Sequence, residues 1–244
     1  MIIHENPELA DDLIQYLRDL LDGKVTLGPV DYKRDLTHFH RSELLGCLMI
    51  PYLERMEKTR PALSKERILY FSRGRAVERV FGADNEPLLR NGITISVDLK
   101  HPKHGLVEIK STVMGSENFA EKLPTRSAHW VEECKAVAAA HDVTSCNLAV
   151  VFMVGNTPSH KWGKPGRVAV DLKAWKMDFT PEELAASWED MLWKRDKVNE
   201  ALDHEEYPEL TTVKVTVPKW GCKECQWAER CPYFAELIME QKEK

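Results

Sequence analysis

The stretch Ile93-Thr-Ile-Ser-Val-Asp98, followed after a turn by Gly105-Leu-Val-Glu108-Ile-Lys110, decides how the rest of this chain is interpreted. Apolar and polar residues alternate in both halves, which predicts two half-buried strands. The residues between them, His101-Pro-Lys-His-Gly105, are typical of a turn. The sequence therefore predicts a β-hairpin.

On this hairpin, Asp98, Glu108 and Lys110 are expected on the same face. Two carboxylates offer the oxygen ligands that Mg²⁺ and Mn²⁺ prefer. A lysine beside such an ion can orient or deprotonate an attacking water and offset the charge of a phosphate. These three are the candidate catalytic residues. An isolated D…ExK pattern is more often an exposed hairpin with solvated charges. Evidence from the rest of the chain is therefore needed to favour a metal site.

Length, charge and hydropathy restrict the classes of protein to which the chain can belong. Its 244 residues fit one α/β domain, and 43% hydrophobic with 30% charged residues is ordinary for a soluble globular protein. No apolar run is long enough to span a bilayer and the first residues lack a signal-peptide pattern, so we expect a cytoplasmic protein without a membrane partner. The net charge of −5 means that DNA binding would need a local positive groove.

Helical and strand patterns alternate along the chain, and this predicts an α/β domain with a mixed central sheet flanked by helices. Asn6, Pro7 and Glu8 form a typical helix start, and Thr180 with Pro181 forms another. The remaining expectations are helices over 64–81 and 126–141, strands over 145–154 and 167–178, and a loop over 114–124.

The C-terminal part carries a second motif, Gly221-Cys222-x-x-Cys225-x5-Cys231-Pro232. A C-x-x-C turn lets two thiolates reach one metal or cluster, and the third cysteine is near enough along the chain to join them. Proline directly after the last cysteine is typical of ferredoxin-type cluster ligands. In a cytosolic chain, grouped cysteines indicate a metal or a cluster before they indicate disulfides.

Three grouped ligands require a fourth, and Cys47 is the best candidate. Cys134 and Cys146 lie in segments that we expect in the core, where cysteine usually behaves as a small hydrophobic residue. A 4Fe–4S cluster and a tetrahedral Zn²⁺ fit the spacing about equally, and for zinc the fourth ligand could instead be His38 or His40. A ligand at Cys47 would connect the N-terminal region to the C-terminal one.

Together, the upstream cysteine, the D…ExK hairpin and the C-x2-C-x5-C motif resemble the RecB-like nucleases of the PD-(D/E)XK superfamily. The chain is most similar to the CRISPR-associated single-domain exonucleases with four cluster-binding cysteines, from about His38 to Pro232. The resemblance implies a restriction-endonuclease-like core and a 4Fe–4S cluster region that joins the N- and C-terminal segments. It also implies Mn²⁺- or Mg²⁺-dependent exonuclease activity on DNA, on single strands or overhangs. DNA and the CRISPR integrase proteins of spacer acquisition, an antiviral defence, are then the implied partners.

The resemblance assigns roles residue by residue. Asp98 matches the metal-bridging aspartate, Glu108 and Lys110 match the E-x-K pair, and the Ile109 carbonyl is an added oxygen ligand. Glu78 stands where the family has a metal-binding histidine, and a carboxylate can replace imidazole on a hard cation. The implied cluster ligands are Cys47, Cys222, Cys225 and Cys231.

A second departure lies in the helix after the hairpin, where Glu133 and Val137 stand in place of the family's Gln-x-x-x-Tyr. This change and the net acidity favour a rival function, a non-catalytic DNA-binding or assembly subunit that keeps the fold and the cluster. A third interpretation is a zinc-stapled interaction module. The candidate DNA-contacting residues, chosen for their cationic or aromatic character, are Arg73, Arg75, Lys161, Trp162, Lys164 and Arg167.

We expect residues 1–244 to form a single RecB-like nuclease domain in three parts. Residues 1–62 would be an N-terminal helical part with the first cluster cysteine, and residues 63–205 the nuclease core. Residues 206–244 would be the C-terminal cluster-binding segment.

Overall fold

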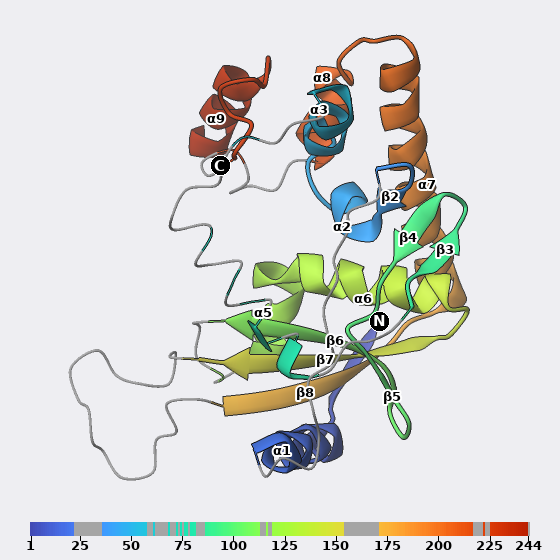
Figure 1. Ribbon diagram of the computed structural model, residues 1–244, viewed down its shortest axis with the longest axis vertical. Coiled ribbons are helices and arrows are strands. Elements are labelled where there is room, and N and C mark those ends of the chain that lie inside the picture. Colours follow the sequence, from blue (N-terminus) through green and yellow to red (C-terminus); the bar gives the residue numbers. More distant parts are fainter. Residues whose placement is uncertain are drawn as a thin grey trace, which may run out of the picture.

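The computed structural model describes residues 1–21, 36–57, 61, 68, 72, 74, 76–77, 79–81, 86–112, 116, 119–153, 171–216, 222 and 225–243. These residues form an α/β fold with mixed sheets flanked by helices, as the sequence predicts (Figure 1). The strands are β1 (Ile2–Glu5), β2 (Phe39–His40), β3 (Leu88–Arg90), β4 (Ile93–Ile95), β5 (Leu99–His101), β6 (Gly105–Thr112), β7 (Ser145–Phe152) and β8 (Asp171–Asp178). The helices are α1 (Pro7–Leu21), α2 (Arg41–Leu44), α3 (Met49–Glu57), α5 (Phe119–Arg126), α6 (Ala128–Ala140), α7 (Pro181–Asp203), α8 (Leu210–Thr216) and α9 (Phe234–Glu243).

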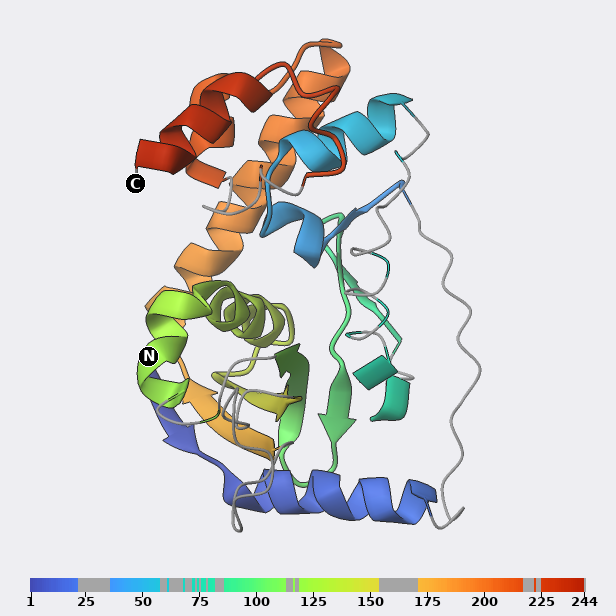
Figure 2. The ribbon, with the colours of Figure 1, turned by 90° about the vertical axis from the view of Figure 1, so that its left-hand side faces the viewer.

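The larger sheet has five strands in the order β1-β8-β7-β6-β5, and the smaller sheet has the order β2-β4-β3. In the larger sheet, β6 and β7 are parallel and the other neighbours are antiparallel. Helix α1 covers one face of this sheet, while α5 and α6 cover the other (Figure 2). Because side chains alternate along β6, Val107 and Ile109 pack with Leu9 and Leu13 of α1. Glu108 therefore points to the α6 face.

A hairpin with the predicted turn and second strand exists, but its first strand is Leu99–His101 and not the predicted 93–98. β4 ends at Ile95 and pairs with β2 and β3 in the smaller sheet. β5 begins at Leu99, which lies opposite Val107 of β6. The alternating run 93–98 therefore supplies a strand only to the smaller sheet, and the chain joins the larger sheet after residues 96–98, which lie outside any strand. Asp98 lies at a bend in this segment, directly before the strand that pairs with β6.

Two prolines lie within helices. Pro124 lies inside α5, where we expected a loop; the side chains of Phe119 and Leu123, one turn apart, are buried, and this burial outweighs the missing backbone donor. Pro51 is the third residue of α3, a position that tolerates proline because the first N–H groups of a helix have no partner within it.

The other predicted elements agree with the structure where it describes them. The helix starts are confirmed: Asn6 Oδ1 accepts the Leu9 amide at 3.2 Å, and Thr180 forms a capping box with Glu183. The helix predicted over 126–141 is α6, and the two later strands are β7 and β8, with residues 167–170 outside the described part. Most of 64–81 also lies outside it.

Helix α3 and the C-terminal helices α8 and α9 lie in the upper region of Figure 1. The ring of Tyr207 lies 5.6 Å from that of Tyr52 and 6.5 Å from that of Tyr233. Arg230 forms an ion pair with Glu57, at the end of α3. In the part of the chain that is described, no helix is both long and apolar enough to cross a membrane.

Candidate active site

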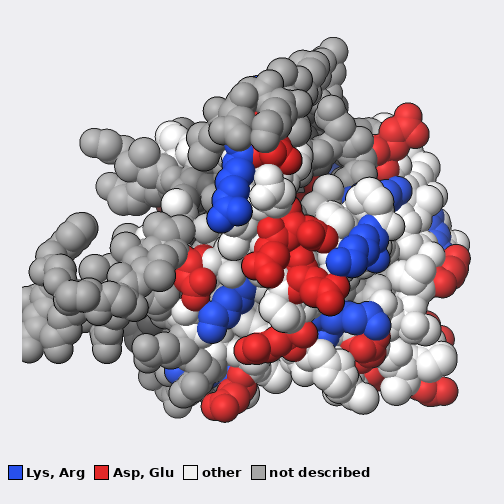
Figure 3. All heavy atoms as spheres, turned by 90° about the horizontal axis from the view of Figure 1, so that it is seen from below, with Lys and Arg blue, Asp and Glu red and all other residues white. Residues whose placement is uncertain are grey.

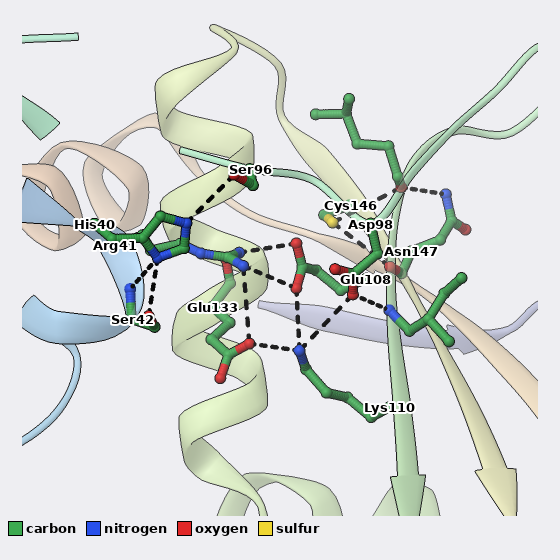
Figure 4. A network of polar contacts seen from close by, with 12 residues as sticks. His40, Arg41, Ser42, Ser96, Asp98, Glu108, Lys110, Glu133, Cys146 and Asn147 are labelled. Atoms are coloured by element: carbon green, nitrogen blue, oxygen red, sulfur yellow. Dashed lines mark hydrogen bonds and ion pairs between the residues drawn. The ribbon is translucent and has the colours of Figure 1, made fainter. Parts of the chain in front are cut away.

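The three charged residues of the predicted hairpin meet at one point (Figure 4). Lys110 Nζ lies 3.3 Å from Glu108 Oε2 and 3.9 Å from Asp98 Oδ2. The Ile109 amide donates a 2.7 Å hydrogen bond to Asp98 Oδ2, which ties the bend before β5 to the middle of β6. The structure thus brings together the D…ExK residues that alternation placed on one face.

Two further residues complete this cluster, and both come from helices. Glu133 of α6 places Oε2 2.7 Å from Lys110 Nζ. Arg41, the first residue of α2, holds Glu108 with two hydrogen bonds, Nη1 to Oε1 at 2.8 Å and Nη2 to Oε2 at 3.1 Å. Arg41 Nη1 also donates to the backbone carbonyl of Glu133 at 3.1 Å. We call these five residues, Arg41, Asp98, Glu108, Lys110 and Glu133, the carboxylate cluster.

The carboxylate cluster is buried and nearly balanced in charge. The Glu108 side chain is 0% exposed and that of Arg41 5%, while the other three retain between 16% and 19%. Three carboxylates face two cationic groups, which leaves one net negative charge when all are ionised. A divalent cation is therefore not opposed by the net charge of the site.

Opposite charges stabilise the ionised forms despite burial. Burial alone would lower the pKa of Lys110, but Glu133, Glu108 and Asp98 together raise it well above its ordinary value. Burial would raise the pKa of Glu133, but Lys110 and Arg41 hold it below its ordinary value. For Arg41, Glu108 and Glu133 likewise outweigh burial and raise the pKa. This arrangement favours the protonated form of Lys110.

A set of polar contacts fixes α2 and so positions Arg41. His40 is the N-cap of α2: its backbone amide donates to Glu43 Oε2 at 2.8 Å, and its ring accepts the amide of Ser42. Arg55 of α3 donates to the same Glu43 oxygen at 3.1 Å. His40 Nε2 also lies 3.3 Å from Ser96 Oγ, so this histidine, considered above as a zinc ligand, holds α2 against the chain before β5.

Arg41 and Glu133 were not among the predicted site residues. Glu133 did carry a signal, because it lies one turn before the buried Val137 on the inward side of α6, where a charged residue needs a partner. Arg41 carried none, since its partner Glu108 is 67 residues away. The predicted ligand Glu78 and the six candidate DNA-contacting residues, Arg73, Arg75, Lys161, Trp162, Lys164 and Arg167, lie outside the described residues.

The four predicted cluster cysteines, Cys47, Cys222, Cys225 and Cys231, are near enough to interact electrostatically, but no three of their sulfur atoms lie within 4.8 Å of one another. Burial most of all, and then the nearby thiols of Cys225, Cys222 and Cys231, raise the pKa of the Cys47 thiol to about 12. The backbone amide of Cys225 donates to the carbonyl of Cys222 at 3.2 Å. All four cysteines lie in or against the large apolar core that contains Trp227. Cys134 and Cys146 are fully buried in this same core, as predicted.

Comparison with known proteins leaves the family of the chain open. No protein-family model and no curated protein matches it. A solved structure described as "Crystal structure of SSO0001" matches with a TM-score of 0.44 and 14% sequence identity, over 93% of this chain and 96% of that chain. Inference about function therefore depends on this chain's own residues.

Proposed function

We propose that this protein is a metal-dependent deoxyribonuclease that cleaves single-stranded DNA or overhangs. The observation that carries this proposal is that carboxylate oxygens of Asp98 and Glu108, from a bend and a strand, both lie within 3.9 Å of Lys110 Nζ. Two carboxylates beside a protonated lysine form the minimal set for phosphodiester hydrolysis with a hard cation. The resemblance to CRISPR-associated exonucleases adds spacer processing, with integrase proteins as partners, as the biological role.

The donor atoms present suit Mn²⁺ or Mg²⁺. Asp98 and Glu108 would hold the ion through oxygen, and the resemblance adds the Ile109 carbonyl and Glu78. When bound, the ion supplies a Lewis acid and makes a coordinated water more acidic. Glu133, the third carboxylate of the cluster, is a further oxygen donor close to Lys110.

The protein's own groups have separate tasks in this proposal. Lys110 stays protonated between carboxylates, so its ammonium group offsets charge on the scissile phosphate and orients the attacking water by hydrogen bonding. The Ile109 amide orients Asp98. Arg41 is a positioning residue, because its two hydrogen bonds fix the carboxylate plane of Glu108.

The same Arg41–Glu108 pair favours a second candidate function. Both oxygens of Glu108 already accept hydrogen bonds from Arg41, and Lys110 shares one of them. A carboxylate that is fully engaged by fixed cations is a weaker metal ligand. This observation supports a non-catalytic DNA-binding or assembly subunit that keeps the fold.

Cleavage of an end-labelled single strand with Mn²⁺ separates the two functions. Asp98→Asn keeps the oxygen that accepts the Ile109 amide but removes the charge, so it should abolish cleavage. Lys110→Met should retain DNA binding and lower the cleavage rate by about 100- to 1,000-fold. The matched control is Lys176→Met, on β8, whose ammonium pairs only with Asp178 among the described residues, and it should cut as wild type does.

Two results would contradict the nuclease proposal. Wild-type protein that binds DNA but cuts neither single nor double strands with Mn²⁺ or Mg²⁺ would favour the non-catalytic subunit. A Lys110→Met variant that cuts at the wild-type rate would show that the E-x-K spacing is accidental.

We also propose a 4Fe–4S cluster on Cys47, Cys222, Cys225 and Cys231, with a structural role. Four thiols from two distant segments would close the long loop between residues 47 and 222. Anaerobically purified protein should contain iron and acid-labile sulfide, and Cys222→Ala should lose both together with much of the soluble yield. Cys134→Ala, in the core, is the matched control and should keep the iron. If wild-type protein instead contains stoichiometric zinc and no sulfide, the cluster proposal is wrong and the cysteines form a zinc staple.

A further inference from the structure

A second group of metal-binding side chains lies at the other end of hairpin β5–β6. It consists of Asp12 on α1 and of His101 and His104 at the turn, and one ligand atom from each lies within 4.8 Å of the other two. His104 Nε2 is 3.0 Å from Asp12 Oδ2, and the two histidine rings have centroids 4.7 Å apart. We call these three residues the histidine site.

Strand alternation explains why the histidine site faces α1. His101 is two residues after Leu99, which packs with Val107 against α1, so both point to that face. The carboxylate cluster lies on the opposite face, towards α6. The two sites therefore share a hairpin but no ligand, and the histidine site is independent of the proposed nuclease function.

The turn that carries His104 is held by buried polar contacts. Asn147, 2% exposed, donates from Nδ2 to the backbone carbonyls of His104 at 2.8 Å and Leu106 at 3.3 Å. Its Oδ1 accepts a 2.9 Å hydrogen bond from Asn6, at the start of α1. Gly105 has a φ of +76°, a conformation that other residues rarely adopt, and so allows the close turn. The ligand positions are thus fixed by the same residues that join the hairpin to α1.

The two histidines offer different ring nitrogens. The backbone amides of Lys103 and His104 both donate to His101 Nδ1 at 3.3 Å, so the lone pair of Nδ1 is engaged and a metal would bind His101 through Nε2, in place of the proton there. For His104, the ion would replace the proton shared between Nε2 and Asp12 Oδ2. Ligands about 2.0–2.1 Å from a tetrahedral ion lie roughly 3.3 Å apart, close to the 3.0 Å observed between these two atoms.

From this geometry we propose that Asp12, His101 and His104 bind a zinc-class divalent cation that staples α1 to the β5–β6 turn. Two imidazoles and one carboxylate suit Zn²⁺ much better than Mg²⁺ or Ca²⁺, which prefer oxygen alone. Seen from the side of α1, acidic side chains gather near the centre of the described surface, with basic ones beside them (Figure 3).

An ammonium group already lies beside this site. Lys103 Nζ is 3.0 Å from Glu8 Oε2 and 3.9 Å from Asp12 Oδ2, and Glu8 is one helical turn before Asp12 on α1. Lys103 thus competes with a metal for Asp12. If Lys103 is removed, Glu8 also becomes a candidate fourth ligand. The metal proposal consequently predicts that Lys103→Ala tightens zinc binding.

The test is equilibrium dialysis of the full-length protein against Zn²⁺, followed by elemental analysis. Zinc bound by the cysteines or by the carboxylate cluster is common to wild type and all variants. The difference in zinc content between wild type and a variant therefore measures the zinc bound at the histidine site. Wild type should bind one zinc more than His101→Ala/His104→Ala and than Asp12→Asn. His204→Ala, at the C-cap of α7, is the matched histidine control and should bind as wild type does. Zinc should also raise the melting temperature of wild type more than that of the double variant.

Two outcomes would overturn the proposal. Equal zinc content in wild type, Asp12→Asn and the double variant would show that the three side chains form only an ion-pair network. Lys103→Ala is an independent test that does not require the double variant to fold. Lys103 is exposed, so this substitution should leave the fold unchanged. A several-fold lower Kd for zinc supports the site, and an unchanged or higher Kd contradicts it.

Discussion

At its Asp98 end, hairpin β5–β6 carries charged groups that are buried, while at its turn the charged groups are half exposed. Glu108 is 0% exposed and paired with an arginine that is 5% exposed, whereas Asp12 is 42% exposed. Both regions bring acids and cations from distant segments to one hairpin. The two regions differ in solvent exposure, and this difference determines how much each contact contributes to the stability of the fold.

Because the carboxylate cluster is buried, the stability of the fold depends on every charged partner in it being present. A buried ion pair has lost its hydration, so its net contribution to stability is small, but removing one partner leaves the other charge uncompensated. At the histidine site, Asp12 is 42% exposed, so water can hydrate its carboxylate, although the His104 ring beside it is only 8% exposed. The comparison teaches that short ion-pair distances alone, 2.8 Å in one region and 3.0 Å in the other, do not indicate equal energetic weight.

The largest expected effect is that of Glu108→Ala on folding. Losing the partner of Arg41 should lower the free energy of unfolding by about 3–5 kcal/mol, whereas Asp12→Ala should change it far less. Urea unfolding of both variants with EDTA present measures the difference. Arg41→Met combined with Glu108→Leu should recover most of the loss, because no buried charge is then left alone. If Asp12→Ala is as damaging as Glu108→Ala, the contrast in burial does not govern these contacts.

The residues that could be predicted from the sequence are those whose partners are near in the chain. Alternation placed Glu108 and Lys110 on one face, and Asp98 lies 3.9 Å from Lys110 even though the predicted strand ends at Ile95. The end of β4 could not be predicted, because it depends on pairing with β2, more than fifty residues earlier.

Arg41 and the histidine site depend on how helices dock across the sheet. Arg41 reaches Glu108 only because His40 and Glu43 fix the start of α2. His101 and His104 appear in the sequence as turn residues, and their role depends on Asp12, 92 residues from His104. The four cysteines were different: the C-x2-C-x5-C spacing has an established chemistry, so Cys47 could be sought as a fourth ligand before any fold was known.

The smallest expected effect concerns acid, and it compares Glu133 with Asp12. Lys110 and Arg41 hold the pKa of Glu133 below its ordinary value of 4.5, against the effect of burial. A carboxyl group with a lowered pKa in the folded state stabilises the fold above pH 4.5, and this stabilisation is lost as the pH falls through the folded-state pKa. Glu133→Gln cannot titrate, so the stability difference between wild type and this variant should shrink steadily below pH 4.5.

Asp12→Asn gives the matched comparison for this acid effect. The hydrogen bond from His104 lowers the pKa of Asp12 too, so the sign of the pH dependence is the same. Water screens Asp12, and its change should therefore be smaller than that of Glu133. Urea unfolding at intervals between pH 3 and pH 7 measures both curves. A Glu133→Gln variant with the same acid sensitivity as wild type would show that Lys110 and Arg41 do not stabilise the ionised carboxylate, and the proposed charge balance of the carboxylate cluster would then be wrong.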